Sequence, residues 1–438
     1  MKIKFFPVIL FISVFTSLYA QSEVITLDEA IEKAFSQNPQ LMAGNYIVEA
    51  SKERDKRSYA GYMPSLSFTT SYARQTGNPT SKPGVPITAG SSPDNTSYNY
   101  YSLGITLNQT IYDFGRTTGA TEVSEAQLKS DIQDINVLKL SVWELVALRY
   151  SLVLTNQELL AVSKRNVESS QKHLEQSKAL FENGLRPKLD MLRLEVELKN
   201  AEAVYISAAS ALKISKNDLL AALGIKDFFD FTAEKFDVSC SKPAFSGISS
   251  YSTDALDARP EMTAIKEKIK LSSMTLKTIK SDYFPILGFT ATFSDAGTEI
   301  SDLAWNWGIG IGISWPIFTG FSTYRSMKEA QNKLSALKFS QTTVEIQIKF
   351  EIMQAFENIE AADARIAAYE AAVKSSKEAN NAAESRYESG SGTVIELLDA
   401  STALANSEAN LVKAEFERAL AYVRWQKALG KIPEKYSK

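Results

Sequence analysis

The sequence predicts a mainly α-helical protein with transmembrane β-strands, and two observations lead to this fold class. Two tracts, 116–183 and 322–389, are each 68 residues long without proline, and apolar residues in the second recur at steps of three and four. Four shorter segments alternate between apolar and polar residues, and two of them precede each long tract. Because this order of segments occurs twice, we expect an internal duplication.

Each long tract ends at a glycine-containing break, and the two breaks are in register. Gly184 and Gly390 are 206 residues apart, as are Asp190 and Glu396. At 1.5 Å per residue, each long helix would extend about 100 Å, which is more than a compact domain needs. We therefore expect two long helical hairpins of coiled-coil character, with tips at 184–187 and 390–392 and return helices at 188–223 and 393–429.

Residues 1–20 have the features of a secretory signal peptide. Lys2 and Lys4 form a basic segment, residues 5–18 are apolar, and Ala20 completes a small-residue cleavage site. The apolar run is too short for a membrane-spanning helix, and no later stretch approaches the length of one. We expect the mature chain to start at Gln21.

The composition excludes several classes of function. A formal net charge of −3 argues against nucleic acid as a partner. The only histidine, His173, and the only cysteine, Cys240, leave no internal disulfide and no histidine-rich metal site. We expect His173 to be a solvated helix residue and Cys240 a packed or idle thiol, with no cofactor, no metal and no catalytic residue.

Within the two repeats, the short segments can be placed in order. The first repeat, 21–223, begins with two helices that Asn38-Pro39 separates and continues with a β-hairpin at 64–112. The second repeat, 255–430, has a helix at 261–281 and a β-hairpin at 285–317. Residues 224–254 between them are mixed and strand-like and are expected to form a small collar, and the tail is 431–438. The short helices can stack end to end on the return helices.

The two β-hairpins allow two interpretations. In the first, one face of each hairpin covers a soluble core. In the second, the strands form the wall of a transmembrane barrel, with apolar residues toward lipid and polar residues toward the lumen. Trp305, Trp307 and Trp315 fit an interfacial aromatic girdle, and the opposite face carries only small or polar residues. We favour the barrel, and we expect residues 77–97 to be a long loop between the first two strands.

Four strands cannot close a barrel, and open strand edges are not tolerated in lipid. The membrane part must therefore be shared between chains. Two copies would give eight strands, and three would give twelve with a wider lumen.

The order and spacing of these motifs resemble the TolC-type outer-membrane efflux proteins over nearly the whole mature chain. The resemblance rests on paired features: Asn38-Pro39 and Arg259-Pro260, Tyr62 and Tyr283 before each hairpin, 111–115 and 317–320 after it, and the two glycine tips. It implies a homotrimer with a 12-stranded β-barrel in the outer membrane of a Gram-negative bacterium and a 12-helix periplasmic tunnel. It also implies a periplasmic adaptor protein and an inner-membrane pump or exporter as partners.

Glu396 and Asp399 are the candidate acidic residues of the second tip. Their simplest role is to favour the positive N-terminal end of a helix. In a trimer facing a bore they would form two rings of negative charge, which is a device for cation selectivity, and these positions match the family's periplasmic acidic ring. A catalytic carboxylate pair here ranks last because no other residue indicates a pocket.

The resemblance further implies a gate latch in which the hydroxyl of Tyr387 donates to Asp190. A second family latch joins an arginine to a hydroxyl, but the corresponding residues are Gly392 and Leu189, which cannot form it. The residues that match the adaptor-facing tips are Gly184, Leu185, Arg186, Gly390 and Ser391. Glycine is also needed for the turns themselves.

The sequence therefore predicts a passive, non-enzymatic outer-membrane exit duct of a tripartite efflux system. The outlet of a type I protein secretion system has the same architecture and stays open as an alternative. A periplasmic coiled-coil scaffold without transport function is the alternative from another class.

Overall fold

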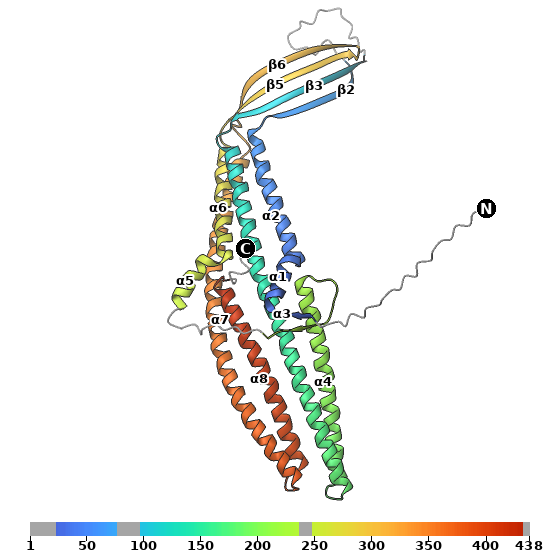
Figure 1. Ribbon diagram of the computed structural model, residues 1–438. Coiled ribbons are helices and arrows are strands. Elements are labelled where there is room, and N and C mark those ends of the chain that lie inside the picture. Colours follow the sequence, from blue (N-terminus) through green and yellow to red (C-terminus); the bar gives the residue numbers. More distant parts are fainter. Residues whose placement is uncertain (1–22, 77–96, 236–247, 432–438) are drawn as a thin grey trace, which may run out of the picture.

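The computed structural model describes residues 23–76, 97–235 and 248–431. They form an elongated molecule with a β-sheet at one end and two helical hairpin tips at the other (Figure 1). The predicted signal peptide, nearly all of the predicted 77–97 loop, Cys240 and the tail after 431 lie outside the described residues.

The elements follow the same order in both halves of the chain. The first half contains β1 (Glu23–Ile25), α1 (Leu27–Gln37), α2 (Pro39–Ser58), the 3₁₀ turn η1 (Tyr59–Tyr62), β2 (Ser65–Thr76), β3 (Ser97–Tyr112), α3 (Arg116–Glu182) and α4 (Lys188–Leu223). The second half contains β4 (Phe231–Ala233), α5 (Ile248–Ala258), α6 (Pro260–Ser281), β5 (Ile286–Glu299), β6 (Asp302–Ser314), α7 (Ser322–Glu388) and α8 (Val394–Ala428). Of the helices described, none is both long and apolar enough to span a membrane.

The four long strands form one antiparallel sheet in the order β2-β3-β5-β6, and β2 and β6 are its edges. The register brings the apolar residues of all four strands to one face: Phe68 pairs with Ile105, Ile105 with Phe293, and Phe293 with Trp307. The opposite face carries mostly small or polar residues, as in the row of Ser67, Thr106, Thr292 and Gly308. Phe68 is 65% exposed and Trp307 67% exposed, so no part of the chain that the structure describes covers the apolar face.

Near the middle of the molecule, β1 and β4 pair in parallel beside α3. The buried hydroxyl of Tyr150 on α3 lies 2.8 Å from the carbonyl oxygen of Ile25 and 2.7 Å from that of Glu234. The segment expected to be strand-like contains only β4 as a strand among its described residues and ends in the helix α5. Within α5, Ala255 is buried and Tyr251 packs edge-on against Trp425.

Each return helix stacks end to end on a short helix, and the two joints use equivalent residues. At the first joint, Asn38 donates through Nδ2 to the carbonyl oxygen of Ala222 at 2.9 Å, which satisfies one of the free carbonyls at the end of α4. Gly224 follows with φ of 84°, and a Cβ there would lie 2.6 Å from the Gln37 carbonyl oxygen. A glycine is therefore required at this contact for both its conformation and its size.

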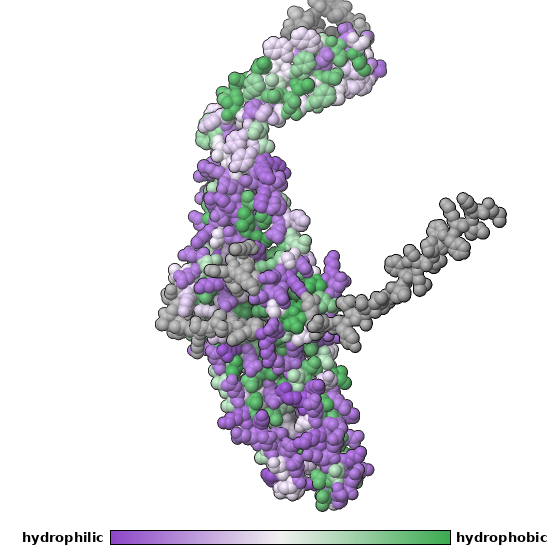
Figure 2. Space-filling view, viewed as in Figure 1, coloured by the Kyte–Doolittle hydropathy of each residue, from purple (hydrophilic) through white to green (hydrophobic). Residues whose placement is uncertain are grey.

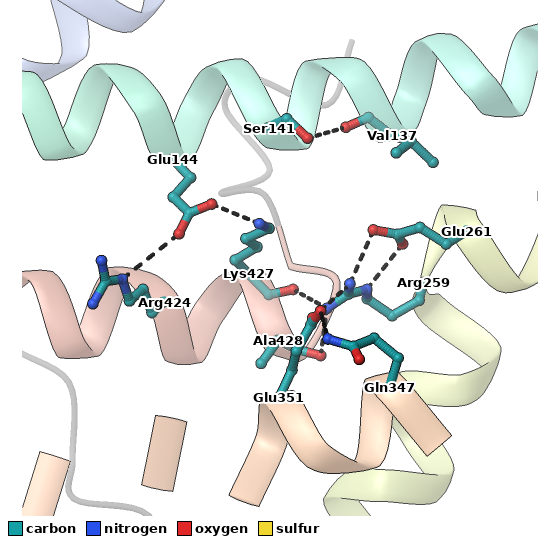
Figure 3. A network of polar contacts seen from close by, with 10 residues as sticks. All are labelled: Val137, Ser141, Glu144, Arg259, Glu261, Gln347, Glu351, Arg424, Lys427 and Ala428. Atoms are coloured by element: carbon teal, nitrogen blue, oxygen red, sulfur yellow. Dashed lines mark hydrogen bonds and ion pairs between the residues drawn. The ribbon is translucent and has the colours of Figure 1, made fainter. Parts of the chain in front are cut away.

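At the second joint Arg259 takes the place of Asn38, and its contacts are shown in Figure 3. Its side chain is 4% exposed and donates to Glu261 and Glu351 at 2.9 Å. Its Nη1 also donates to the carbonyl oxygens of Lys427 and Ala428 at 3.2 and 3.3 Å. One guanidinium thus holds α6, α7 and the end of α8 together.

Replacing Arg259 by Ala is expected to lower the free energy of unfolding by about 3 kcal/mol, because it leaves two carboxylates without their buried partner. Denaturant unfolding followed by circular dichroism measures this loss. Arg424→Ala is the matched control. Arg424 is 48% exposed and lies 3.7 Å from Glu144, and such an exposed ion pair contributes at most about 1 kcal/mol. Equal losses in the two variants would contradict the assigned role of Arg259.

Candidate functional site at the hairpin tips

The two helix-helix turns lie at the end of the molecule that is farthest from the sheet (Figure 1). Gly184 and Gly390 adopt φ of 71° and 79°, which allows each long helix to end and reverse its direction. A small apolar cluster then joins the two turns; its buried members are Leu194, Tyr387, Val394 and Leu397. The tips therefore pack as one unit within a single chain, and we refer to residues 184–190 and 387–399 together as the mouth.

Tyr387 is at the centre of this unit and is 1% exposed. Its hydroxyl donates to Ser177 Oγ of α3 at 3.0 Å. The guanidinium carbon of Arg186 lies 4.8 Å from the centre of its ring. Tyr387 thus ties α7 of the second hairpin to α3 and the tip of the first.

Asp190 lies in the first turn of α4 and is 9% exposed. The structure places the Tyr387 hydroxyl on Ser177 and not on Asp190, so the expected partner of the tyrosine is replaced in this conformation. Asp190 nevertheless suits its position because a carboxylate is favourable at a helix N-terminus. The Tyr387–Asp190 latch stays a proposal for another state of the mouth.

Glu396 and Asp399 are both exposed on the first two turns of α8. Glu396 lies 3.4 Å from Nη2 of Arg386, which offsets part of its charge. Asp399 has no ion pair within the described residues, so its charge is the more available of the two. The described part of the chain holds no group of three or more side chains suited to bind a metal ion.

The residues expected to face an adaptor differ in their surroundings. Gly184, Gly390 and Ser391 are exposed, and Leu185 is 70% exposed although it is a large apolar residue. Arg186 is only half-buried and its Nη2 donates to carbonyl oxygens of the second hairpin. The exposed tip surface is therefore smaller and more apolar than the sequence alone suggested.

Several polar contacts between α3 and the second hairpin were not foreseen from the sequence, and three of them involve glutamates of that hairpin. Lys172 Nζ lies 2.7 Å from Glu384 and Gln176 Nε2 lies 2.9 Å from Glu388. Farther from the tip along α3, Arg165 lies 3.0 Å from Glu408 of α8. The available signal was the stripe of small polar residues on α3 that faces inward; its buried members are Ser163, Ser170 and Ser177.

His173 lies in this stripe, and the expectation that it is solvated was wrong. It is 3% exposed, and its Nε2 lies 3.1 Å from Ser169 Oγ. Burial lowers the pKa of His173 below its usual range, and the carboxylate of Glu384 opposes that shift. The ring is buried because α3 packs against the second hairpin, which the helical pattern of α3 alone could not reveal.

Stability near the mouth is expected to fall as the pH drops below about 6.5, the pKa of an unfolded histidine. The folded state has the lower pKa and so binds fewer protons than the unfolded state in that range. The loss between pH 7.5 and 5.5 is at most about 1.4 kcal/mol per chain. His173→Gln should flatten the change in thermal midpoint over this range. An unchanged pH dependence would contradict the assignment, since the sequence holds no other histidine.

The three tryptophans lie at the opposite end of the molecule, on the apolar face of the sheet or just beyond it. Trp305 and Trp307 are near the outer end of β6, and Trp315 follows its inner end, where its Nε1 donates to the Tyr283 carbonyl oxygen at 3.0 Å. Ten residues of strand span about 33 Å, which after a tilt matches an apolar band of roughly 25 Å. Apolar surface is spread over the sheet in Figure 2, whereas the helices carry mostly hydrophilic surface.

Comparison with known proteins places these features in a class. The family model described as outer membrane efflux protein matches residues 30–225 and 252–431. The chain therefore belongs to the outer membrane efflux protein family, and it resides in the outer membrane with its helices in the periplasm.

Individual relatives are distant but cover nearly the full length. The chain is 23% identical to outer membrane efflux protein BepC of Brucella suis over 96% of this chain and 88% of that protein. It is 22% identical to outer membrane protein TolC of Escherichia coli, over 98% and 87%, and 21% identical to alkaline protease secretion protein AprF of Pseudomonas aeruginosa, over 92% and 83%. The crystal structure of CusC superimposes with a TM-score of 0.81 at 16% identity, covering 93% and 92% of the two chains.

Proposed function

We propose that three copies of this chain form a passive exit duct, with a 12-stranded barrel in the outer membrane and a 12-helix tunnel below it. The observation that carries the proposal is the four-stranded sheet with two open edges and one exposed apolar face. In lipid that face is favourable, but its edges need partners. Edge β6 of one copy pairing with edge β2 of the next supplies them.

The helices also support a ring of copies. An exposed apolar stripe runs along α7, where Phe339, Ile346 and Phe350 are 76%, 64% and 57% exposed at steps of seven and four. On the other flank of the chain, Tyr46 of α2 is 73% exposed and Ile206 of α4 is 67% exposed. Two different flanks that are both apolar fit a head-to-tail contact, which closes into a ring by rotation.

The test is the mass and location of the assembled protein. Native mass spectrometry of the detergent-extracted outer membrane should give three chains, and Phe350→Glu should shift the mass toward one chain. Lys349→Glu, a neighbouring exposed position on α7, is the control and should keep the trimer. A wild-type mass of one chain, or recovery in the soluble periplasm, would contradict the proposal.

In this proposal the mouth is the inner entrance of the duct and meets a periplasmic adaptor protein, while an inner-membrane pump supplies the energy. Exposed Leu185 and the exposed residues Gly390 and Ser391 of the second tip are the contact residues. A photocrosslinking residue at position 185 should capture the adaptor in cells, whereas the same residue at buried position 194 should not. Membership of the efflux family supports this role over that of a scaffold without transport function.

The outlet of a type I protein secretion system is the second candidate function, because AprF is named as a protease secretion protein. The two functions share one duct and differ in cargo. A deletion strain separates them: raised sensitivity to small toxic compounds indicates efflux, and loss of a secreted protein from the medium indicates secretion.

A further inference from the structure

The first tip reaches across to the second through one side chain. Nη2 of Arg186 donates to the carbonyl oxygen of Gly392 at 2.7 Å and to that of Tyr387 at 3.2 Å. These acceptors lie 206 and 201 positions further along the chain. The guanidinium also covers the Tyr387 ring at 4.8 Å. Among the described residues, no other residue of the first tip (184–187) makes a polar contact with the second hairpin.

The position of these carbonyls explains why a cation is favourable there. Tyr387 is in the last turn of α7, where carbonyl oxygens lack partners within the helix and the helix dipole is negative. Its carbonyl oxygen also accepts the N–H of Gly390 in the following turn at 3.2 Å. Hydrogen bonds from a charged donor are stronger than neutral ones. Arg186 thus caps the C-terminal end of a helix that belongs to the other hairpin.

The second tip is shaped to receive this side chain. Gly392 is buried, and a Cβ at this position would lie 2.9 Å from Arg386 Cβ and 3.1 Å from the Tyr387 nitrogen. Its own N–H donates to the Arg386 carbonyl oxygen at 2.8 Å, and its carbonyl oxygen accepts from Arg186. On the first tip, Pro187 restricts the backbone of Arg186 to extended conformations, which reduces the entropy lost on ordering it.

We propose that Arg186 is a clasp between the two tips of each subunit, so that both hairpins hold one position at the mouth. Releasing the guanidinium from the two carbonyls frees the end of α7 and the following turn to move apart from the first tip. Position 392 is a glycine and cannot supply the arginine of the family's second latch. In this chain Arg186 of the first tip supplies an arginine contact between the two tips instead. This inference rests on the proposed function only in treating the tips as the inner entrance.

Hydrogen exchange measured by mass spectrometry on the full-length protein tests the clasp without any transport assay. Arg186→Ala should speed exchange of the amides in 386–397 about tenfold, the expected size for losing a charged hydrogen bond. Arg186→Lys retains the charge but lacks the planar donor fork and should show a smaller increase. Arg193→Ala removes an exposed arginine of α4 seven residues away and should leave these amides unchanged.

Exchange in 340–360, far from the tips, confirms that each variant is folded. Faster exchange confined to 386–397 in Arg186→Ala supports the clasp. Wild-type exchange rates in that segment, or an equal increase in Arg193→Ala, overturn it. Because the trimer mass is measured separately, failure of the clasp is distinguishable from failure of the duct proposal.

Discussion

Replacing Asp399 by Asn is expected to weaken block of the channel by a trivalent cation by more than tenfold. A trimer presents this carboxylate three times, and each contributes about 1 kcal/mol to a unit charge at about 4 Å in water, and more to a trivalent ion. Removing three charges therefore exceeds the 1.4 kcal/mol that corresponds to a factor of ten. Single-channel recordings in planar bilayers with hexamminecobalt measure this block, and the reversal potential in a salt gradient should move toward zero.

Glu396→Gln should have a smaller effect than Asp399→Asn because Arg386 already offsets the charge of Glu396 at 3.4 Å. Glu415→Gln is the matched control, since this exposed carboxylate of α8 is about 24 Å further from the tip. If block and reversal potential in Asp399→Asn equal those of the wild type, the carboxylates do not face the bore.

Tyr387→Ala is expected to raise the single-channel conductance severalfold. It removes the buried ring that packs against Leu194, Val394 and Leu397, and the loss of an aromatic side chain from a packed site costs about 3–5 kcal/mol. It also removes the surface on which Arg186 lies and the bond to Ser177. The mouth should then populate wider states, which bilayer recordings detect as larger unitary currents.

Conservative variants identify which contact of Tyr387 matters. Tyr387→Phe and Ser177→Ala each remove one hydrogen bond worth about 1 kcal/mol, and combining them should add little because they share that bond. Asp190→Asn removes the carboxylate of the proposed Tyr387–Asp190 latch and leaves the Tyr387–Ser177 hydrogen bond in place. A large effect of Asp190→Asn that vanishes in the Tyr387→Phe background would favour the latch, and wild-type conductance in Tyr387→Ala would contradict both.

The repeated architecture could be predicted from local pattern because each element carries its own signal. The long helices were expected at 116–183 and 322–389 and are observed at Arg116–Glu182 and Ser322–Glu388. Absence of proline, glycine at the breaks and a two-residue period in the strands are properties of neighbouring residues. Such signals can be read from the sequence without knowledge of any contact between distant segments. The fold class and the family could therefore be recognised from the sequence.

The partners of the site residues could not be predicted in the same way. A side chain on a long helix can face its own hairpin, the other hairpin or a second chain, and helical spacing does not distinguish these. His173 was expected to be solvated but is buried. Arg186 was expected at the adaptor-facing tip, and its contact with the second tip was not part of that expectation. The tyrosine of the expected latch meets Ser177 of α3.

By itself, the sequence determined two helical hairpins, four strands with one apolar face and an acidic second tip. Only the tertiary structure decided how the hairpins meet at the mouth. The physical reason is that Arg186, Tyr387 and Ser177 interact across about 200 residues of chain. Their contacts depend on how the two helical hairpins are rotated about their long axes. A helical pattern identifies the buried face of a hairpin, but it does not identify the residues of the neighbouring hairpin that this face contacts.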